Sequence, residues 1–238
     1  MPMDEHEVLQ TLRTFSRPEN VAGMARFGIA PTNNLGISIV TLRKYAKKIG
    51  TDHALALSLW DSGIHEARLL ATMIDDPTLV TKQQMDHWAS QFDSWDVCDQ
   101  CCNNLFYKTP YAYEKVHHWC TKEKEYVKRA GFTLVAVLAV HDKKASDEQF
   151  LNFFPLIKQQ ATDNRNYVKK AVNWALRQIG KRNTTLNKKA LALAYDLKQS
   201  DSPAARWIAT DAIRELTSEK IRNSLTIKKK RTKTKRKP

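Results

Sequence analysis

The sequence has 238 residues, and 39 Lys and Arg against 25 Asp and Glu give it a net charge of +14. With only seven glycines and eight prolines, and with charges interrupting each apolar stretch, it has neither long flexible linkers nor the roughly 20 apolar residues of a membrane span. Its first ten residues, MPMDEHEVLQ, lack the apolar region of a secretory signal, so we expect a cytoplasmic protein without a membrane partner.

The hydrophobic pattern predicts helices along most of the chain. Apolar residues recur at three- and four-residue spacing, and no stretch alternates with the period of two that marks a strand. Turn-forming residues such as Asp61-Ser62-Gly63 separate the periodic segments, which is typical of an α-solenoid or a helix bundle. The predicted helices, in chain order, are 40–49, 54–60, 64–74, 83–92, 95–107, 111–119, 125–140, 148–158, 166–179, 186–197 and 204–216.

An internal repeat favours the solenoid over the bundle. EYVKRAGFTLVAVLA and NYVKKAVNWALRQIG share a Tyr-Val-Lys-basic-Ala pattern, and their tyrosines, Tyr126 and Tyr167, are 41 residues apart. A period near 40 made of two helices is typical of HEAT repeats, so we predict an all-α solenoid of about six HEAT-like two-helix repeats. The related segments are 65–75, 125–139, 166–180 and 204–216.

Each of these segments carries a basic residue in the same register. In a HEAT-like solenoid the second helix of each repeat lines the concave face, so these residues would form a positive stripe along it. Any one of them alone is more often an ordinary solvated charge, but their repetition in a basic chain favours a binding surface. Nucleic acid is the leading partner and an anionic membrane a distant second. The residues are Arg68, Arg129, Lys170 and Arg206.

The end of the chain is the most basic segment. Residues 228–238 contain eight basic residues and no acidic one. Without them 31 basic residues remain against 25 acidic ones, so residues 1–227 still carry a net charge of +6. We therefore predict a basic repeat domain over residues 1–227, followed by a disordered basic tail at 228–238.

The cysteines raise the question of a metal site. Three of them lie within 98–102, where Cys98 and Cys101 have the C-x-x-C spacing of zinc ligands, and Cys120 follows with two histidines nearby. Structural zinc sites usually lie on turns, however, whereas this segment is predicted to be helical. We favour buried reduced thiols and expect neither a metal nor a cofactor.

Asp99 is the most conspicuous candidate for chemistry. It lies within the predicted helix 95–107, beyond the first turn where a carboxylate would serve the helix end. Trp95 is four residues earlier on the same face, and Trp174 is four residues after Lys170. Tryptophans at such spacing more often belong to a core, but aromatic, acidic and basic groups together favour a site for a flat cationic ligand on a polyanion.

These residues belong to a set of motifs that resembles the DNA alkylation repair family, the AlkD-type DNA glycosylases with HEAT-like repeats. The resemblance extends from Met24 to Leu216, and the order and spacing of its motifs are more specific than any one of them. The motifs are Leu35-Gly36-Ile37 with Leu42-Arg43, Trp95-Asp96-x-x-Asp99, Lys128-Arg129-Ala130, and Lys169-Lys170-Ala171-x-x-Trp174-x-x-Arg177.

The resemblance implies a monomeric enzyme that hydrolyses the N-glycosidic bond of cationic N3- or N7-alkylated purines in double-stranded DNA, with no lyase step and no base flipping. It implies that the protein is nucleoid-associated when bound, that Asp99 is the catalytic carboxylate and that Trp95 and Trp174 flank the lesion. Arg129 would lie near the DNA backbone, and we expect the other basic residues of the motifs and the stripe to bind DNA with it: Arg43, Arg68, Lys128, Lys169, Lys170, Arg177 and Arg206.

Two departures from the family pattern keep a noncatalytic alternative open. Ser94 stands where catalytic members can have a second tryptophan, and Ile39 stands where a polar DNA contact is expected. Some relatives bind branched or distorted DNA without detected glycosylase activity, and a HEAT-type protein scaffold is a third possibility. The presence of Asp99 and Trp174 favours the enzyme.

Overall fold

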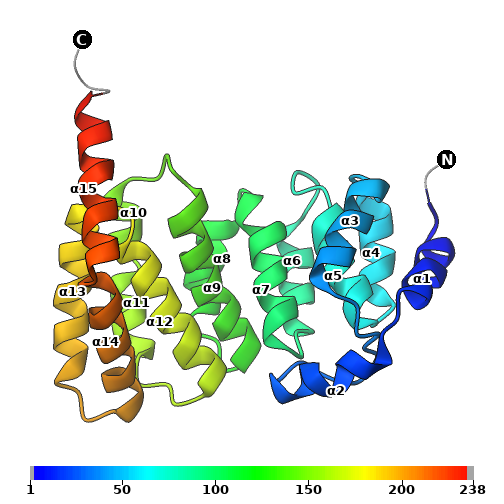
Figure 1. Cartoon of the computed structure of the whole chain (residues 1–238), viewed down its shortest axis with the longest axis horizontal. Helices are drawn as coiled ribbons and strands as arrows, with labels where there is room; N and C mark the ends of the chain where they lie inside the picture. The colour runs from blue at the N-terminus through cyan, green and yellow to red at the C-terminus, as the bar shows by residue number, and fades with distance from the viewer. Residues whose placement is uncertain (1–2, 235–238) are drawn as a thin grey trace. The chain divides into compact units, whose positions relative to one another are not determined.

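The computed structural model of the chain describes residues 3–234, with the side chains of residues 3–227. The described residues form helices joined by short turns and include no strand, which confirms the all-α prediction (Figure 1). The chain divides into two compact units, Met1–Ala112 and Tyr113–Pro238. The boundary between the two units therefore falls inside the predicted repeat domain, residues 1–227.

The first unit is built around α5, which packs against α3, α4 and α7. Its aromatic core is a stacked pair, Trp60 and Trp88, whose ring centroids are 4.0 Å apart. Both indoles are buried, so these two tryptophans stabilise the core. The helices of this unit are α1 (Glu5–Thr14), α2 (Pro18–Arg26), α3 (Ile39–Ile49), α4 (His53–Asp61), α5 (His65–Ile74), α6 (Lys82–Ser90), α7 (Trp95–Asn104) and the 3₁₀ turn η1 (Phe106–Lys108).

The second unit is built around α9, whose residues from Val127 to Ala139 are all buried. Helix α12 packs against α9 on one side and against α14 on another, and α13 packs against α14. The helices are α8 (Ala112–Trp119), which begins at the boundary, α9 (Glu125–His141), α10 (Asp147–Leu151), α11 (Phe154–Gln160), α12 (Asn166–Gly180), α13 (Thr184–Lys198), α14 (Pro203–Leu216) and α15 (Glu219–Thr234).

The repeat predicted from the sequence is visible as contact between equivalent residues. Tyr126 at the start of α9 and Tyr167 at the start of α12 lie with their ring centroids 5.5 Å apart. Because the two tyrosines hold the same position in successive repeats, their contact shows that α9 and α12 are neighbouring layers in matching register. Burial of each apolar face thus depends on the next repeat.

The helices differ from the predicted ones in four places. The predicted helix 95–107 ends at Asn104 as α7, and residues 106–108 form the separate 3₁₀ turn η1. The predicted helix 148–158 is broken into α10 and α11, because Pro155 at the second position of α11 has no backbone N–H to continue a helix. Helices α1 and α2 were not predicted, although the Asp4–Glu7 capping box before α1 is a recognisable start signal. Helix α15 continues to Thr234 within the predicted tail 228–238, whose last four residues lie outside the described part.

The cysteine-rich segment forms α7 as expected, and Cys98, Cys101, Cys102 and Cys120 are all buried. Burial raises the pKa of the Cys101 thiol well above its usual value and also raises that of Cys120. Such thiols remain protonated and pack as small apolar groups. Between residues 3 and 227, no three Cys, His, Asp or Glu side chains gather into a metal-binding cluster. In the part of the chain that is described, none of the helices has the length and apolar character needed to cross a membrane.

Candidate functional site

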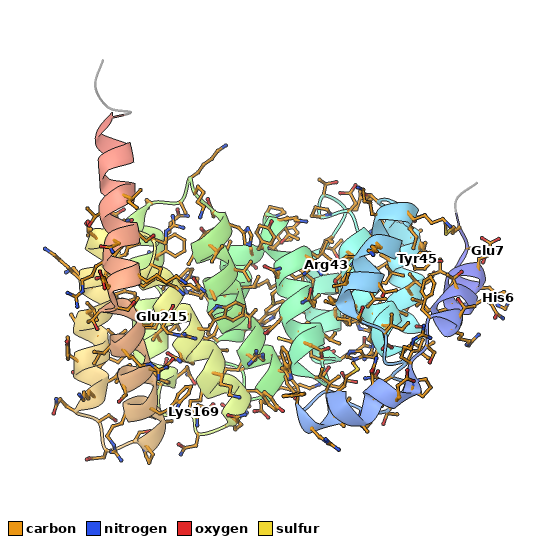
Figure 2. All side chains as sticks on the ribbon, viewed as in Figure 1. His6, Glu7, Arg43, Tyr45, Lys169 and Glu215 are labelled. Carbon is orange, nitrogen blue, oxygen red and sulfur yellow. The ribbon has the colours of Figure 1, made fainter. Side chains whose placement is uncertain are left out.

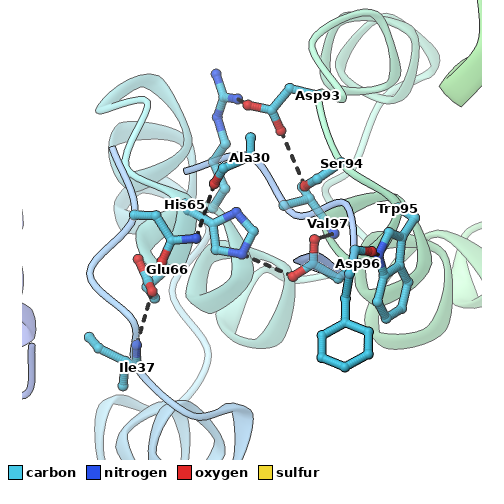
Figure 3. Close-up of polar contacts among 12 residues, drawn as sticks. Ala30, Ile37, His65, Glu66, Asp93, Ser94, Trp95, Asp96 and Val97 are labelled. Atoms are coloured by element: carbon cyan, nitrogen blue, oxygen red, sulfur yellow. Dashed lines mark hydrogen bonds and ion pairs between the residues drawn. The ribbon is translucent and has the colours of Figure 1, made fainter. Parts of the chain in front are cut away.

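The start of α7 takes part in a set of polar contacts with α5 (Figure 3). Ser94 is the N-cap residue and is fully buried, and Trp95 and Asp96 form the first turn. Asp99 follows one turn after Trp95 and is half-buried, as is the Trp95 side chain. The predicted pairing of Trp95 and Asp99 on one helix is therefore present, because α7 begins at Trp95.

Asp96 is held by a histidine from α5. The Nε2 atom of His65 lies 2.9 Å from a carboxylate oxygen of Asp96, and the other oxygen accepts a hydrogen bond from the Val97 amide. Burial on its own would raise the pKa of Asp96, but the hydrogen bond and charge of His65, together with the hydrogen bonds from Ser94 and the Val97 amide, outweigh it, and the net shift is downward. Burial likewise opposes protonation of His65, yet Asp96 raises the pKa of His65 above its usual 6.5.

The next residue of α5, Glu66, fixes the loop that precedes α3. Its carboxylate is buried and accepts hydrogen bonds from the amides of Leu35 at 2.8 Å and Ile37 at 3.0 Å. The start of α5 therefore holds the loop through Glu66 and the start of α7 through His65 (Figure 3). Neither residue was predicted to be functional, since His-Glu at a helix start is not distinctive in sequence.

The motif Leu35-Gly36-Ile37 now has a physical explanation. Gly36 has a φ of +72°, and a Cβ atom added to it would lie 2.0 Å from the Arg17 carbonyl oxygen. The Arg17 amide in turn donates to the Leu35 carbonyl at 2.7 Å, and the Asn20 amide group donates to the Gly36 carbonyl. Only glycine allows the loop to approach the start of α2 this closely.

A cavity of about 650 Å³ opens among these elements. Trp95 forms part of its wall and is fixed there, because its indole N–H donates to the Phe27 carbonyl at 2.8 Å. Helix α2 contributes no buried residue and forms one side of the cavity. The lining residues are Asn20, Gly23, Met24, Phe27, Ile29, Gly36, Ile37, Ser38, Ile39, Leu69, Trp95, Asp96 and Gln100.

Two predicted DNA-binding arginines belong to the first unit. Arg43 is exposed on α3 (Figure 2). Together with Lys47 it lines a hollow at the protein surface. Arg68 on α5 is less accessible, because its guanidinium lies 5.3 Å from the centre of the Trp60 ring and 3.8 Å from Asp93. Arg43 is thus open to a ligand, whereas Arg68 already has partners within the protein.

In the second unit the Lys128-Arg129 motif is directed into the protein. Arg129 is 6% exposed and donates to the Tyr167 carbonyl at 2.8 Å. Lys128 is 5% exposed, and its ammonium lies 3.2 Å from Asp163 and 2.8 Å from Gln160. Lys128 thus connects α9 to the end of α11 and the turn after it, and Arg129 connects α9 to α12. Their binding to DNA stays a prediction.

Helices α12 and α14 are joined by a ladder of side chains, each pair separated by 38 residues. At one end the Lys169 ammonium lies 5.0 Å from the Trp207 ring, and at the other Arg177 forms an ion pair with Glu215 (Figure 2). Between them the Asn173 side chain donates to Asp211 at 2.7 Å. Lys169 and Arg177 therefore hold neighbouring repeats together, whatever else they bind.

Other predicted residues of this unit lie outside the ladder. Lys170 is exposed, and Trp174 one turn later is half-buried. Arg206 is exposed, and its guanidinium donates hydrogen bonds to the carbonyls of Ser200 at 2.9 Å and Asp201 at 2.8 Å. Trp174 belongs to the second unit while Asp99 belongs to the first, so the placement of Asp99 between two tryptophans stays a prediction, as does the concave basic face.

Comparison with known proteins agrees with the fold and with the family resemblance. The model of a family described as DNA alkylation repair enzymes matches residues 8–216. One similar solved structure is described as a new family of proteins related to the HEAT-like repeat DNA glycosylases with affinity for branched DNA structures. It has a TM-score of 0.74 at 20% sequence identity, over 90% of this chain and 95% of that chain, which shows the same HEAT-like fold. No curated protein matches the chain.

Proposed function

Because the chain belongs to the DNA alkylation repair enzyme family, we propose that it is a monofunctional DNA glycosylase. Its substrates are purines that carry a positive charge from alkylation at N3 or N7, within double-stranded DNA. The observation that carries this proposal is Asp99 one helical turn after Trp95 on α7, in a chain with a net charge of +14. We expect it to act as a monomer, without a cofactor, on nucleoid DNA in the cytoplasm.

The proposed reaction requires one ionised carboxylate from the protein and no general acid. An alkylated purine that is already cationic leaves as a neutral base, so no general acid is needed. As its bond to the sugar breaks, positive charge develops on the deoxyribose, and an ionised Asp99 would stabilise that charge and orient the attacking water. With no lysine placed as a nucleophile in this scheme, the product is an abasic site and no strand cleavage follows.

The two tryptophans would supply the surroundings of the reacting sugar. The face of an indole attracts positive charge, which contributes roughly 0.5–2 kcal/mol depending on desolvation. Trp95 is restrained by its hydrogen bond to Phe27, so its indole is held in one orientation before DNA binds. We propose that Trp95 and Trp174 contact the backbone on either side of the lesion, and that the charged base reacts without leaving the stack.

The test is release of a modified base from methylated duplex DNA. Under single-turnover conditions the protein should release 7-methylguanine or 3-methyladenine, and Asp99→Asn should lower the rate by about 10²-fold or more while DNA binding persists. Asp93→Asn is the matched control, because Asp93 lies just before α7 and its side chain is half exposed. A wild-type protein that releases neither base would refute the proposal.

A second candidate is a noncatalytic protein that binds branched or distorted DNA. Two observations favour it: residue 94, beside Trp95, is a buried serine and not a second tryptophan, and the solved relative is described as having affinity for branched DNA. This candidate predicts salt-sensitive binding to a four-way junction, tighter than to linear duplex and unaffected by Asp99→Asn. No base would be released in that case.

A further inference from the structure

We infer that the cavity between α2 and α7 binds an unpaired nucleobase of distorted DNA. Its volume of about 650 Å³ falls within the roughly 300–1,000 Å³ typical of small-ligand pockets. All its lining residues belong to the first unit, so the site is complete within Met1–Ala112. The inference rests on the proposed DNA binding and is independent of glycosidic bond hydrolysis.

The walls of the cavity suit a flat aromatic ring. Trp95 lines one side with its N–H already satisfied by Phe27, so its remaining contact surface is apolar. Phe27 also lines the cavity, although its side chain is 74% exposed. Aromatic side chains that remain accessible at a cavity rim are the groups on which unstacked bases pack, and such stacking accepts any base.

One polar group in the cavity matches the edge of a base. Asp96 is a carboxylate whose oxygens already accept from His65, Ser94 and Val97, and since a carboxylate has about four acceptor sites it keeps capacity for one more hydrogen bond. A carboxylate only accepts, so it would select a ligand edge that donates, such as the amino group of adenine, guanine or cytosine. The His65 ion pair fixes the direction in which Asp96 accepts.

The surroundings favour a base that is attached to a DNA strand. Arg26 is exposed directly before Phe27 in the chain, where it can meet a phosphate while Phe27 meets the base. Asp99 does not line the cavity, so the base held there is distinct from the one whose glycosidic bond Asp99 would help to break. We therefore assign the cavity to a base left without a partner, as in a bulge.

Gly23 provides a way to close the cavity without disturbing the fold. It lies on α2 and lines the cavity, and a Cβ atom added to it would meet nothing within 4 Å. Gly23→Leu therefore places a side chain in the space assigned to the base. Ala22→Leu adds the same side chain to the exposed neighbouring position of α2, outside the cavity lining, and is the matched control.

The experiment compares a duplex that has one bulged adenine with the fully paired duplex, by fluorescence anisotropy at fixed salt. The wild-type protein and Ala22→Leu should bind the bulged duplex about tenfold more tightly, the change expected for one stacked base. Gly23→Leu should lose that preference and keep its affinity for paired DNA. Phe27→Ala, which removes an exposed ring, should reduce the preference in the same direction.

A second readout locates the base directly. A photoreactive 5-iodocytosine in the bulge, which carries an amino group for Asp96, should form its crosslink to Phe27, and Gly23→Leu should abolish it. Equal behaviour of Gly23→Leu and Ala22→Leu, or crosslinks that map outside the cavity, would overturn the inference and leave the proposed function intact. Absence of any DNA binding by the wild-type protein would instead refute both.

Discussion

The Nε2 atom of His65 and a carboxylate oxygen of Asp96 lie 2.9 Å apart, with side-chain exposures of only 3% and 14%. This pair joins α5 to the first turn of α7, the helix that also carries Trp95 and Asp99. The position of the proposed catalytic carboxylate is therefore determined partly by a histidine 34 positions earlier in the sequence.

The stabilisation by the His65–Asp96 pair depends on pH. Because the pKa of His65 is raised, its contribution is complete below about pH 6.5 and is lost as the pH rises through the folded-state pKa. Because the pKa of Asp96 is lowered, its contribution is present above about pH 3.8 and is lost as the pH falls. His65→Gln should cost about 2 kcal/mol near pH 5 and clearly less near pH 9.

The measurement is denaturant unfolding followed by circular dichroism across that pH range. His118→Gln serves as the control, because His118 is exposed on α8 and its replacement should leave the free energy of unfolding nearly constant. A cost of His65→Gln that is the same at pH 5 and pH 9 would contradict the pairing.

The loop that carries Gly36 should not tolerate a side chain. Gly36→Ala combines a φ of +72° with a Cβ only 2.0 Å from the Arg17 carbonyl oxygen, so the loop or the start of α2 must move. We expect a loss of at least about 2 kcal/mol in the free energy of unfolding. Gly63→Ala separates the two effects, since Gly63 has a similar φ of +68° but its nearest neighbour, the Asn33 side chain, is 3.9 Å from the added Cβ atom, and it should cost only about 1 kcal/mol.

The ladder between α12 and α14 should contribute measurably to stability. A double-mutant cycle on Arg177 and Glu215, both about a quarter exposed, should give a coupling energy of about 1 kcal/mol. The ion pair between Lys158 and Asp196 is the control, because both side chains are more than half exposed and should couple by about 0.3 kcal/mol. Equal coupling in the two cycles would show that the ladder adds nothing to the packing of the repeats.

The predicted DNA-binding residues should separate into two groups by their accessibility. Lys170→Ala removes an exposed charge, so it should weaken DNA binding, lower the slope of log K against log salt by about 1, and leave stability unchanged. Arg177→Ala should mainly destabilise α12 against α14, with a smaller change in that slope. Identical salt slopes for Lys170→Ala and the wild type would remove Lys170 from the DNA surface.

Much of the fold could be predicted from local patterns in the sequence. The three- and four-residue spacing of apolar residues located most of the helices between 40 and 216, because each helix buries one face. The tyrosines 41 residues apart identified the stacking of α9 on α12, because equivalent residues of successive repeats meet. The start of α7 was also predictable, because a polar N-cap residue precedes Trp95 there.

The sequence alone determined that this chain is helical and basic, that its repeats recur near 40 residues, and that Trp95 and Asp99 share a helix. Only the tertiary structure decided which charges are accessible. Lys128, Arg129 and Arg177 contact partners 32 to 38 residues away in the sequence. Lys170, by contrast, is exposed. Helical periodicity fixes the face from which a side chain projects. Whether that face meets solvent or another helix depends on contacts that no local pattern records.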